Sequence, residues 1–124
     1  MKLFVITLIS IFSFSFTIKD ISEDISNALK QGNAASLVKF FPEKISIKVL
    51  TQEDLLSKSQ AQVLIEDFFA KHKVKSYKTG HTSVVNVEQQ FITGSLDTNN
   101  GKFRISILVR GNLISQFRIE NDNG

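Results

Sequence analysis

The spacing of apolar residues predicts helices at the start of the folded chain. Between residues 20 and 32 the apolar side chains recur three or four positions apart, as on one face of a helix: Ile21, Ile25, Ala28 and Leu29. Asp20 and Glu23 form a capping-box pair at its start, and Gly32 suits its end. Asn33 then caps a second, shorter helix that Pro42 closes.

One strand and one long helix follow. Apolar and polar residues alternate over 44–50, which predicts a half-buried strand. Ser57 and Gln60 form a second capping box. Behind them lies the clearest helical pattern of the chain: Ala61, Leu64, Ile65, Phe68 and Phe69.

After residue 75 the apolar period changes to two, the period of strands. The pattern predicts strands at 76–87, 90–98, 102–110 and 113–120, and Asn100-Gly101 is a strong hairpin signal. Helices followed by an antiparallel meander indicate an α+β fold, with the helices on one face of a curled sheet. The length suits a single domain over residues 18–124.

The hairpins set which side chains share a face. A turn at Asn100-Gly101 places Asp97 opposite Arg104 and Leu96 opposite Ile105. A three-residue loop over 110–112 pairs Ile105 with Phe117, because the alternative register would put charge into the core. Arg104 and Arg118 then become cross-strand neighbours.

These registers sort the strand residues between the two faces of the sheet. The face expected under the helices holds Ile92, Leu96, Phe103, Ile105, Ile107, Val109, Leu113, Phe117 and Ile119. A turn at Glu88-Gln89 adds Tyr77, Thr79, His81, Ser83 and Val85 to it. The other face is expected to carry Asp97, Arg104, Gln116, Arg118 and Glu120, with Phe91, Leu108 and Ile114 among them.

Residues 1–17 have the layout of a secretory signal peptide. Lys2 precedes an apolar run over 3–11, and small residues then alternate with Phe up to Thr17. We expect cleavage near Ser15 or Thr17 and export to the periplasm or the cell exterior, with no stable membrane span left afterwards. A retained N-terminal anchor is the alternative, although the run is short for a membrane span.

Composition narrows the chemistry. The chain of 124 residues contains no Cys, which excludes a disulfide framework, a thiolate nucleophile and a lipid-anchored N-terminus. Two His without matching carboxylates predict no metal site, and no cofactor-binding motif is present. A net charge of +3 is too small to indicate nucleic acid, which is not an expected partner of an exported protein.

Several short stretches resemble a bacterial family of small exported proteins of unknown function with the nuclear-transport-factor-two-like cone fold. Those stretches are Ser57-Lys58-Ser59-Gln60-Ala61, Asp67-Phe68-Phe69, His81, Gly94-Ser95-Leu96 with Thr98, Asn100-Gly101-Lys102-Phe103-Arg104 and Arg118-Ile119-Glu120. The resemblance implies N-terminal helices packed in the concave face of a curved, mainly antiparallel sheet, with a cavity inside. It implies no activity, since the superfamily combines isomerases and dehydratases with plain binding modules.

The first candidate site is the inner row Tyr77, Thr79, His81 and Ser83. Polar groups on an apolar inner face are what a small-ligand pocket needs, and a histidine there could move protons. The alternative is a core histidine that bonds a backbone carbonyl or Tyr77. No carboxylate is predicted on this face, which weighs against proton abstraction.

The second candidate site is Asp97, Arg104 and Arg118 on the outer face. Two opposed arginines repel unless an anion or a carboxylate lies between them, so this row predicts an anion or partner-protein site. The alternative is a surface ladder closed by Asp97 and Glu120. A basic run, Lys71, Lys73, Lys75 and Lys78, is either a solvated helix end or a contact for an anionic lipid headgroup or an acidic polysaccharide.

These patterns favour an exported, non-catalytic binding domain. Its partner would be a small ligand in the cavity or a protein, including a second copy that associates through the outer face as a homodimer. The alternative is a small-molecule enzyme of the isomerase or dehydratase type that uses His81 in the cavity.

Overall fold

The computed structural model describes residues 21–86 and 88–122. Three helices, α1 (Ile21–Gln31), α2 (Ala34–Val38) and α3 (Lys58–Lys71), lie before or between the strands. The strands are β1 (Lys44–Val49), β2 (Gln52–Ser57), β3 (Val74–Asn86), β4 (Gln89–Thr98), β5 (Gly101–Arg110) and β6 (Leu113–Asn121). The predicted signal peptide lies outside the described residues, and none of the helices described is long and apolar enough to cross a membrane.

The helix ends form as their sequences predict. Gly32 has φ +61°, which a glycine adopts without the steric cost that a Cβ would bring. The side chain of Asn33 accepts a hydrogen bond from the Ser36 amide at 3.1 Å and caps α2. Ser57 and Gln60 form the reciprocal capping box of α3, with bonds of 3.2 and 3.0 Å. These caps satisfy backbone donors that the first turn leaves unpaired.

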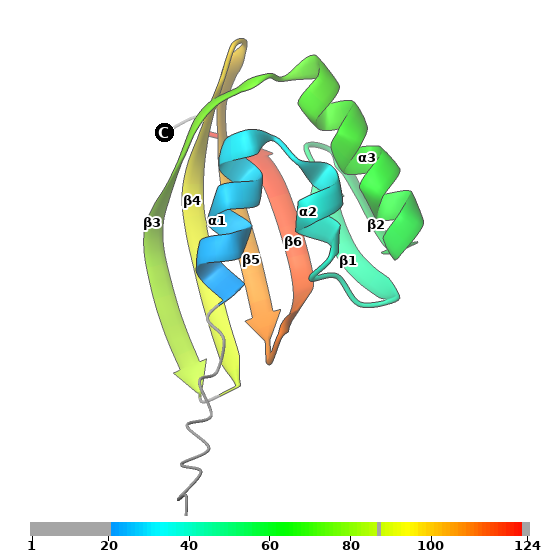
Figure 1. Ribbon diagram of the computed structural model, residues 1–124, viewed down its shortest axis with the longest axis vertical. Coiled ribbons are helices and arrows are strands. Elements are labelled where there is room, and N and C mark those ends of the chain that lie inside the picture. The colour runs from blue at the N-terminus through cyan, green and yellow to red at the C-terminus, as the bar shows by residue number, and fades with distance from the viewer. Residues whose placement is uncertain (1–20, 87, 123–124) are drawn as a thin grey trace, which may run out of the picture.

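The six strands form one curved sheet in the order β2-β1-β6-β5-β4-β3 (Figure 1). All neighbours are antiparallel except β1 and β6, which are parallel. The helices cover one face, with α1 over β3 and α3 over β1 and β2. The α+β cone architecture is confirmed.

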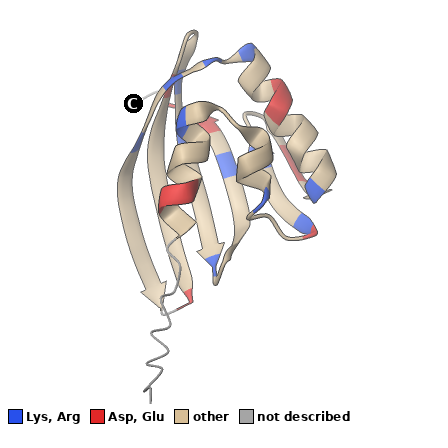
Figure 2. Cartoon of the chain, viewed as in Figure 1, with Lys and Arg blue, Asp and Glu red and all other residues tan. Residues whose placement is uncertain are grey.

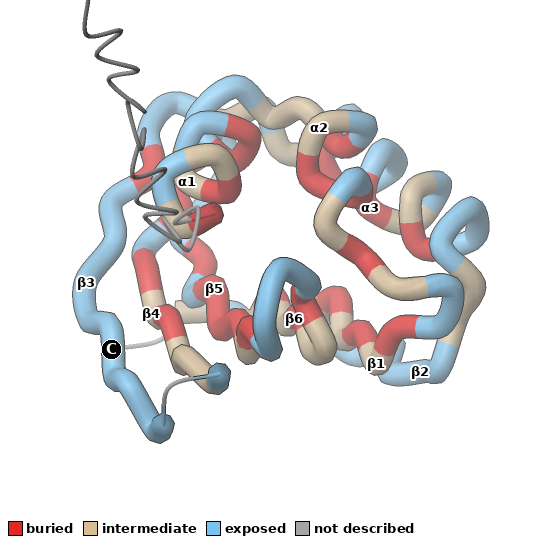
Figure 3. Tube along the Cα trace, turned by 60° about the horizontal axis from the view of Figure 1, so that its bottom comes forward, coloured by how far each residue is buried: buried red, intermediate tan, exposed pale blue. Residues whose placement is uncertain are grey.

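The core lies between the helices and the covered face of the sheet, where Figure 3 shows the buried positions facing one another. Aromatic side chains fill much of it: Phe41 packs on Phe117 at a ring separation of 5.8 Å, and Phe68 packs on Phe103 at 5.1 Å. The predicted stripe of α3 is buried at Ala61, Ile65, Phe68 and Phe69 and partly buried at Leu64.

Strand β2 was not predicted. It pairs with β1 through a two-residue turn at Leu50-Thr51, in which Leu50 has φ +59°. A leucine in the left-handed region is rare, because its Cβ meets the backbone there. Leu50 is held by a hydrogen bond from its amide to the Ile119 carbonyl and by contact with the core.

The predicted pairing of β4 with β5 is wrong by two residues. Asp97 lies opposite Lys102, and Arg104 lies opposite Ser95. The Thr98 hydroxyl donates to the Gly101 carbonyl at 2.8 Å and accepts from the Asn100 amide, which places the turn at Asn99-Asn100. A shift of two keeps every side chain on its predicted face.

The predicted pairing of Arg104 with Arg118 is also wrong. Arg104 lies opposite Glu120, and Arg118 lies opposite Ser106. Near the turn, an extra residue in β6 shifts the register between Leu108 and Val109, so that Val109 pairs with Ile114. Such a bulge reverses the side-chain alternation beyond it.

This bulge exchanges two side chains between the faces. Ile114, expected on the outer face, is fully buried, and its amide bonds the Phe40 carbonyl at 2.7 Å. Leu113, expected under the helices, is 44% exposed.

Candidate functional site

The inner candidate row is split by a bulge in β3. Tyr77 and Thr79 lie opposite Leu96 and Gly94 on the helix side, as predicted. The register then shifts at Gly80, so His81 lies opposite Thr93 and Ser83 opposite Phe91 on the outer face, where both are exposed. The predicted inward placement of His81 and Ser83 is therefore wrong, because one extra residue inverts the alternation.

Tyr77 is the candidate residue that the fold buries most. Its ring lies over Gly94, where a Cβ would come within 2.6 Å of two ring carbons. Burial raises the pKa of the Tyr77 phenol above its ordinary value, and a hydrogen bond with the Thr79 side chain opposes this shift in part. Tyr77 thus acts as a packing residue beneath α1.

The inner side of the cone is apolar where the structure describes it. The only buried polar residues among residues 21–86 and 88–122 are Thr98 and Ser106. No carboxylate or histidine of these residues is buried there, where general acid–base chemistry would need one. The Thr98 hydroxyl is already used in the β4–β5 turn.

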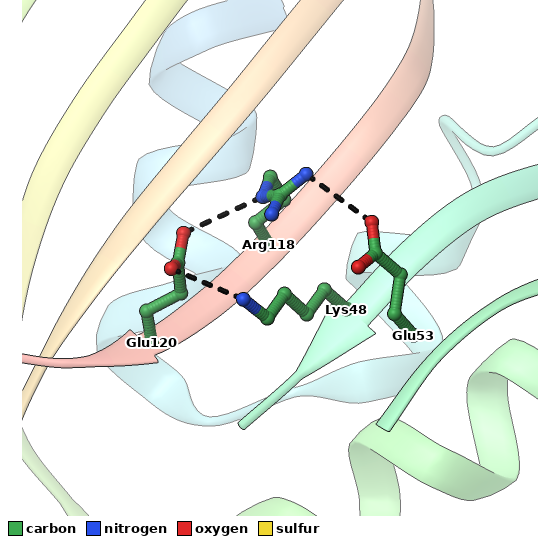
Figure 4. Close-up of polar contacts among 4 residues, drawn as sticks. All are labelled: Lys48, Glu53, Arg118 and Glu120. Carbon is green, nitrogen blue, oxygen red and sulfur yellow. Dashed lines mark hydrogen bonds and ion pairs between the residues drawn. The ribbon is translucent and has the colours of Figure 1, made fainter. Parts of the chain in front are cut away.

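The outer face carries a network of four charged side chains on β1, β2 and β6 (Figure 4). Lys48 and Arg118 lie side by side in the β1–β6 register, where two like charges repel. Glu120 bridges them: it accepts from Lys48 Nζ at 3.3 Å and from Arg118 Nε at 3.4 Å. Arg118 Nη1 also donates to Glu53 at 3.4 Å.

This network is electrostatically closed. It contains two cations and two carboxylates, and the Lys48 ammonium, followed by the Arg118 guanidinium, holds the pKa of Glu120 below its usual value. The candidate residue Arg118 is therefore already bound by two carboxylates. Arg118 is paired with Glu120, as the alternative of a closed ladder expected, but the second acid is Glu53, since Asp97 lies opposite Lys102.

The other members of that candidate site lie apart from Arg118. Arg104 reaches Asp122 at 3.8 Å on the exposed surface, and Asp97 faces Lys102 in the register. Sequence reasoning missed Lys48 and Glu53, because they join Arg118 only through the parallel β1–β6 pairing and the β2 strand. Apart from the alternation over 44–50, no local signal marks either residue.

A row of residues, called the apolar band below, crosses the outer face next to the network; it is apolar at Phe91, Leu108 and Leu55 and polar between Leu108 and Leu55. Phe91 lies opposite Leu108, and both are half-buried. Leu108 lies opposite Gln116, which neighbours Ser46 and then Leu55 in the registers of the next strands. Leu55, at the far edge, is 63% exposed. The outer face of the sheet thus carries both apolar and charged side chains.

Among the described residues, no group of His, Asp and Glu side chains is arranged to hold a metal ion. The exposed His81 lies on β3, whereas the half-buried His72 is the C-cap residue of α3.

Comparison with solved structures places this fold among known ones. A DUF4783 family protein from Bacteroides uniformis superposes with a TM-score of 0.78 at 29% identity, covering 85% of this chain and all of that one. A relative from Bacteroides fragilis gives 0.76 at 30% identity, covering 83% and 100%. A ketosteroid isomerase-like protein from Erwinia carotovora atroseptica gives 0.69 at 7% identity, covering 86% and 95%, a likeness of fold alone.

Among curated proteins, none is significantly similar to the chain. The model of a family described as a domain of unknown function, DUF4783, matches residues 22–121, which include every described helix and strand except the first residue of α1, Ile21. With its nuclear-transport-factor-two-like fold, the chain belongs to the DUF4783 family.

Proposed function

We propose that the domain is an exported, non-catalytic binding module that associates with a second copy of itself through the outer face of its sheet. The observation that carries this proposal is the apolar band of Phe91, Leu108 and Leu55, which lies on the face that no helix covers. Phe91 and Leu108 are adjacent apolar side chains on this open sheet face, and an exposed apolar surface of this kind favours a protein partner.

The charge network supports a second copy as that partner. Its two cations and two carboxylates sum to no net charge, so the network itself adds no net repulsion when two copies meet. The band runs across the sheet from β2 to β4, and a twofold axis through it would set one band against the other. Arg118 and Glu53 at its side would then exchange partners across the interface.

The inner face supports the non-catalytic part of the proposal. The enzyme alternative placed His81 in the cavity, and β3 turns that side chain to the opposite face. The described inner surface offers apolar packing and the buried Tyr77 in its place. Export rests on residues 1–17, whose apolar run follows Lys2.

Sedimentation velocity of the mature chain tests the proposal. We expect a dimer for the wild type, and a monomer for Leu108→Gln, since the substitution replaces the apolar side chain beside Phe91 with an amide that is costly to bury. Val63→Gln is the matched control, because Val63 is 65% exposed on α3, away from the outer face, and this variant should remain dimeric.

The Arg118→Gln variant, measured at several salt concentrations, distinguishes the contribution of the charge network to the dimer from that of the apolar band. Arg118→Gln should weaken the dimer at low salt, and the difference from wild type should shrink as salt screens the charges. Circular dichroism of each variant checks that the fold survives. A wild-type monomer at every salt concentration and at high protein concentration would exclude self-association.

A further inference from the structure

Four exposed lysines gather at one end of the sheet without carboxylate partners among the described residues. Lys73 directly precedes β3, Lys75 and Lys78 lie on that strand, and Lys102 lies at the start of β5; all four are exposed. None of them forms an ion pair with another residue that the structure describes, whereas Lys48 and Arg118 do. Figure 2 shows Lys and Arg positions gathered where α3 ends and β3 begins.

Nearby acids do not neutralise this end. Lys71 is bound to Asp67 at 3.0 Å and Arg104 to Asp122 at 3.8 Å. Asp97 lies opposite Lys102 in the register but not within ion-pair distance of it. Six cations therefore share three carboxylates here, which leaves a local excess of positive charge.

The backbone that carries these lysines is held firmly. The amide of Asn99 donates to the Lys73 carbonyl at 3.0 Å, and the Lys73 amide donates to the Asn99 side chain at 3.2 Å. The Asn100 side chain donates to the Lys71 carbonyl at 2.9 Å and pairs with His72. These bonds join the end of α3 to the β4–β5 turn. The lysines after α3 and Lys102 after the turn are therefore held close to one another by the backbone.

From this arrangement we propose that the basic end, defined by Lys73, Lys75, Lys78 and Lys102, binds a linear acidic polysaccharide through its repeated sulfate or carboxylate groups. Lys75 and Lys78 are separated by about 10 Å along β3, and Lys73 precedes the strand, beyond a register shift between Val74 and Ser76. Unpaired cations repeated along such a line complement a polymer with regularly spaced anions. Lys78 and Lys102 lie opposite Ser95 and Asp97, so this polymer would bind at one end of the outer face, beside the second copy proposed above.

Two other polyanions fit this end less well. Membrane insertion needs exposed apolar side chains beside the lysines. The large exposed ones are elsewhere, at Leu55, Val63, Val84, Val85 and Leu113. Single-stranded nucleic acid favours exposed rings for base stacking, yet Tyr77, Phe68 and Phe103 are buried and the His72 ring packs on both phenylalanines.

Titration calorimetry of the mature chain with dextran sulfate, alginate and uncharged dextran tests the proposal. We expect the two acidic polymers to bind and dextran not to bind. The Lys73→Gln/Lys75→Gln/Lys78→Gln variant should bind about tenfold more weakly or worse. Its affinity should also depend less on salt, because with fewer lysines bound the polymer releases fewer counterions.

A matched variant shows whether binding depends on the basic end or only on the net charge of the protein. Lys39→Gln/Lys44→Gln/Lys58→Gln removes three exposed lysines from other parts of the surface and should bind within about twofold of wild type. Equal losses in both triple variants would overturn the proposal, as would failure of the wild type to bind either acidic polymer at low salt. Tighter binding to anionic vesicles or to single-stranded DNA would replace it with those partners.

Discussion

We predict that position 94 requires glycine because the Tyr77 ring leaves no room for a Cβ, and not because of the backbone angles at this position. In Gly94→Ala the new methyl group would lie 2.6 Å from the Tyr77 carbons Cε2 and Cζ and would meet the hydroxyl as well. Tyr77 is buried, so its ring cannot swing into solvent. Overpacking of this kind costs about 1–3 kcal/mol, offset by about 0.4–1 kcal/mol because alanine restricts the unfolded chain.

A double-mutant cycle isolates this contact. Leucine lacks the Oη, Cε2 and Cζ atoms that the alanine methyl would meet. In a Tyr77→Leu background, Gly94→Ala should therefore leave the free energy of unfolding unchanged or raise it slightly. The cycle should therefore show a coupling of about 1–3 kcal/mol, measurable as a shift of about 1 M in the urea midpoint. Circular dichroism is the suitable signal, since the chain has no Trp. A cost for Gly94→Ala that is the same in both backgrounds would refute the packing argument.

Three further predictions concern single groups. Tyr77 is the one tyrosine, so the absorbance change at alkaline pH reports its ionisation alone. Because its pKa is raised in the folded state, the phenol ionises first in the unfolded chain, and the free energy of unfolding should fall as pH rises above about 10. A midpoint of the folded protein's absorbance titration at or below that pH would contradict the burial of Tyr77. Phe68→Ala should lower the free energy of unfolding by about 3–5 kcal/mol, and a loss under about 1 kcal/mol would mean that α3 is misplaced. Mass spectrometry of exported protein should find the chain cut near Ser15 or Thr17; a mature pool that retains Met1 would argue for an anchor.

Local signals in the sequence were sufficient for most elements. Caps at Asn33 and Ser57 and a glycine at position 32 fixed the helix ends, because side chains a few residues away complete those bonds. Strand β2 escaped prediction because its turn, Leu50-Thr51, contains none of the residues that favour turns.

The candidate sites were harder to predict, because they depend on register. One extra residue at Gly80 moved His81 and Ser83 to the outer face, and another in β6 moved Ile114 to the core. Neither bulge has a signature that alternation alone reveals. The partners of Arg118 come from strands distant in sequence, and a parallel β1–β6 pairing cannot be read from hairpin turns.

Double electron–electron resonance between copies tests the central proposal most directly. The chain has no Cys, so one spin label can be placed at Ser95→Cys on the outer face or, as a control, at exposed Ala35→Cys on α2. Association through the outer face predicts a strong, short-range coupling between copies labelled at position 95 and a weak, long-range one for position 35. Short-range coupling from position 35 alone, or none from either label in a sample at high protein concentration, would contradict it.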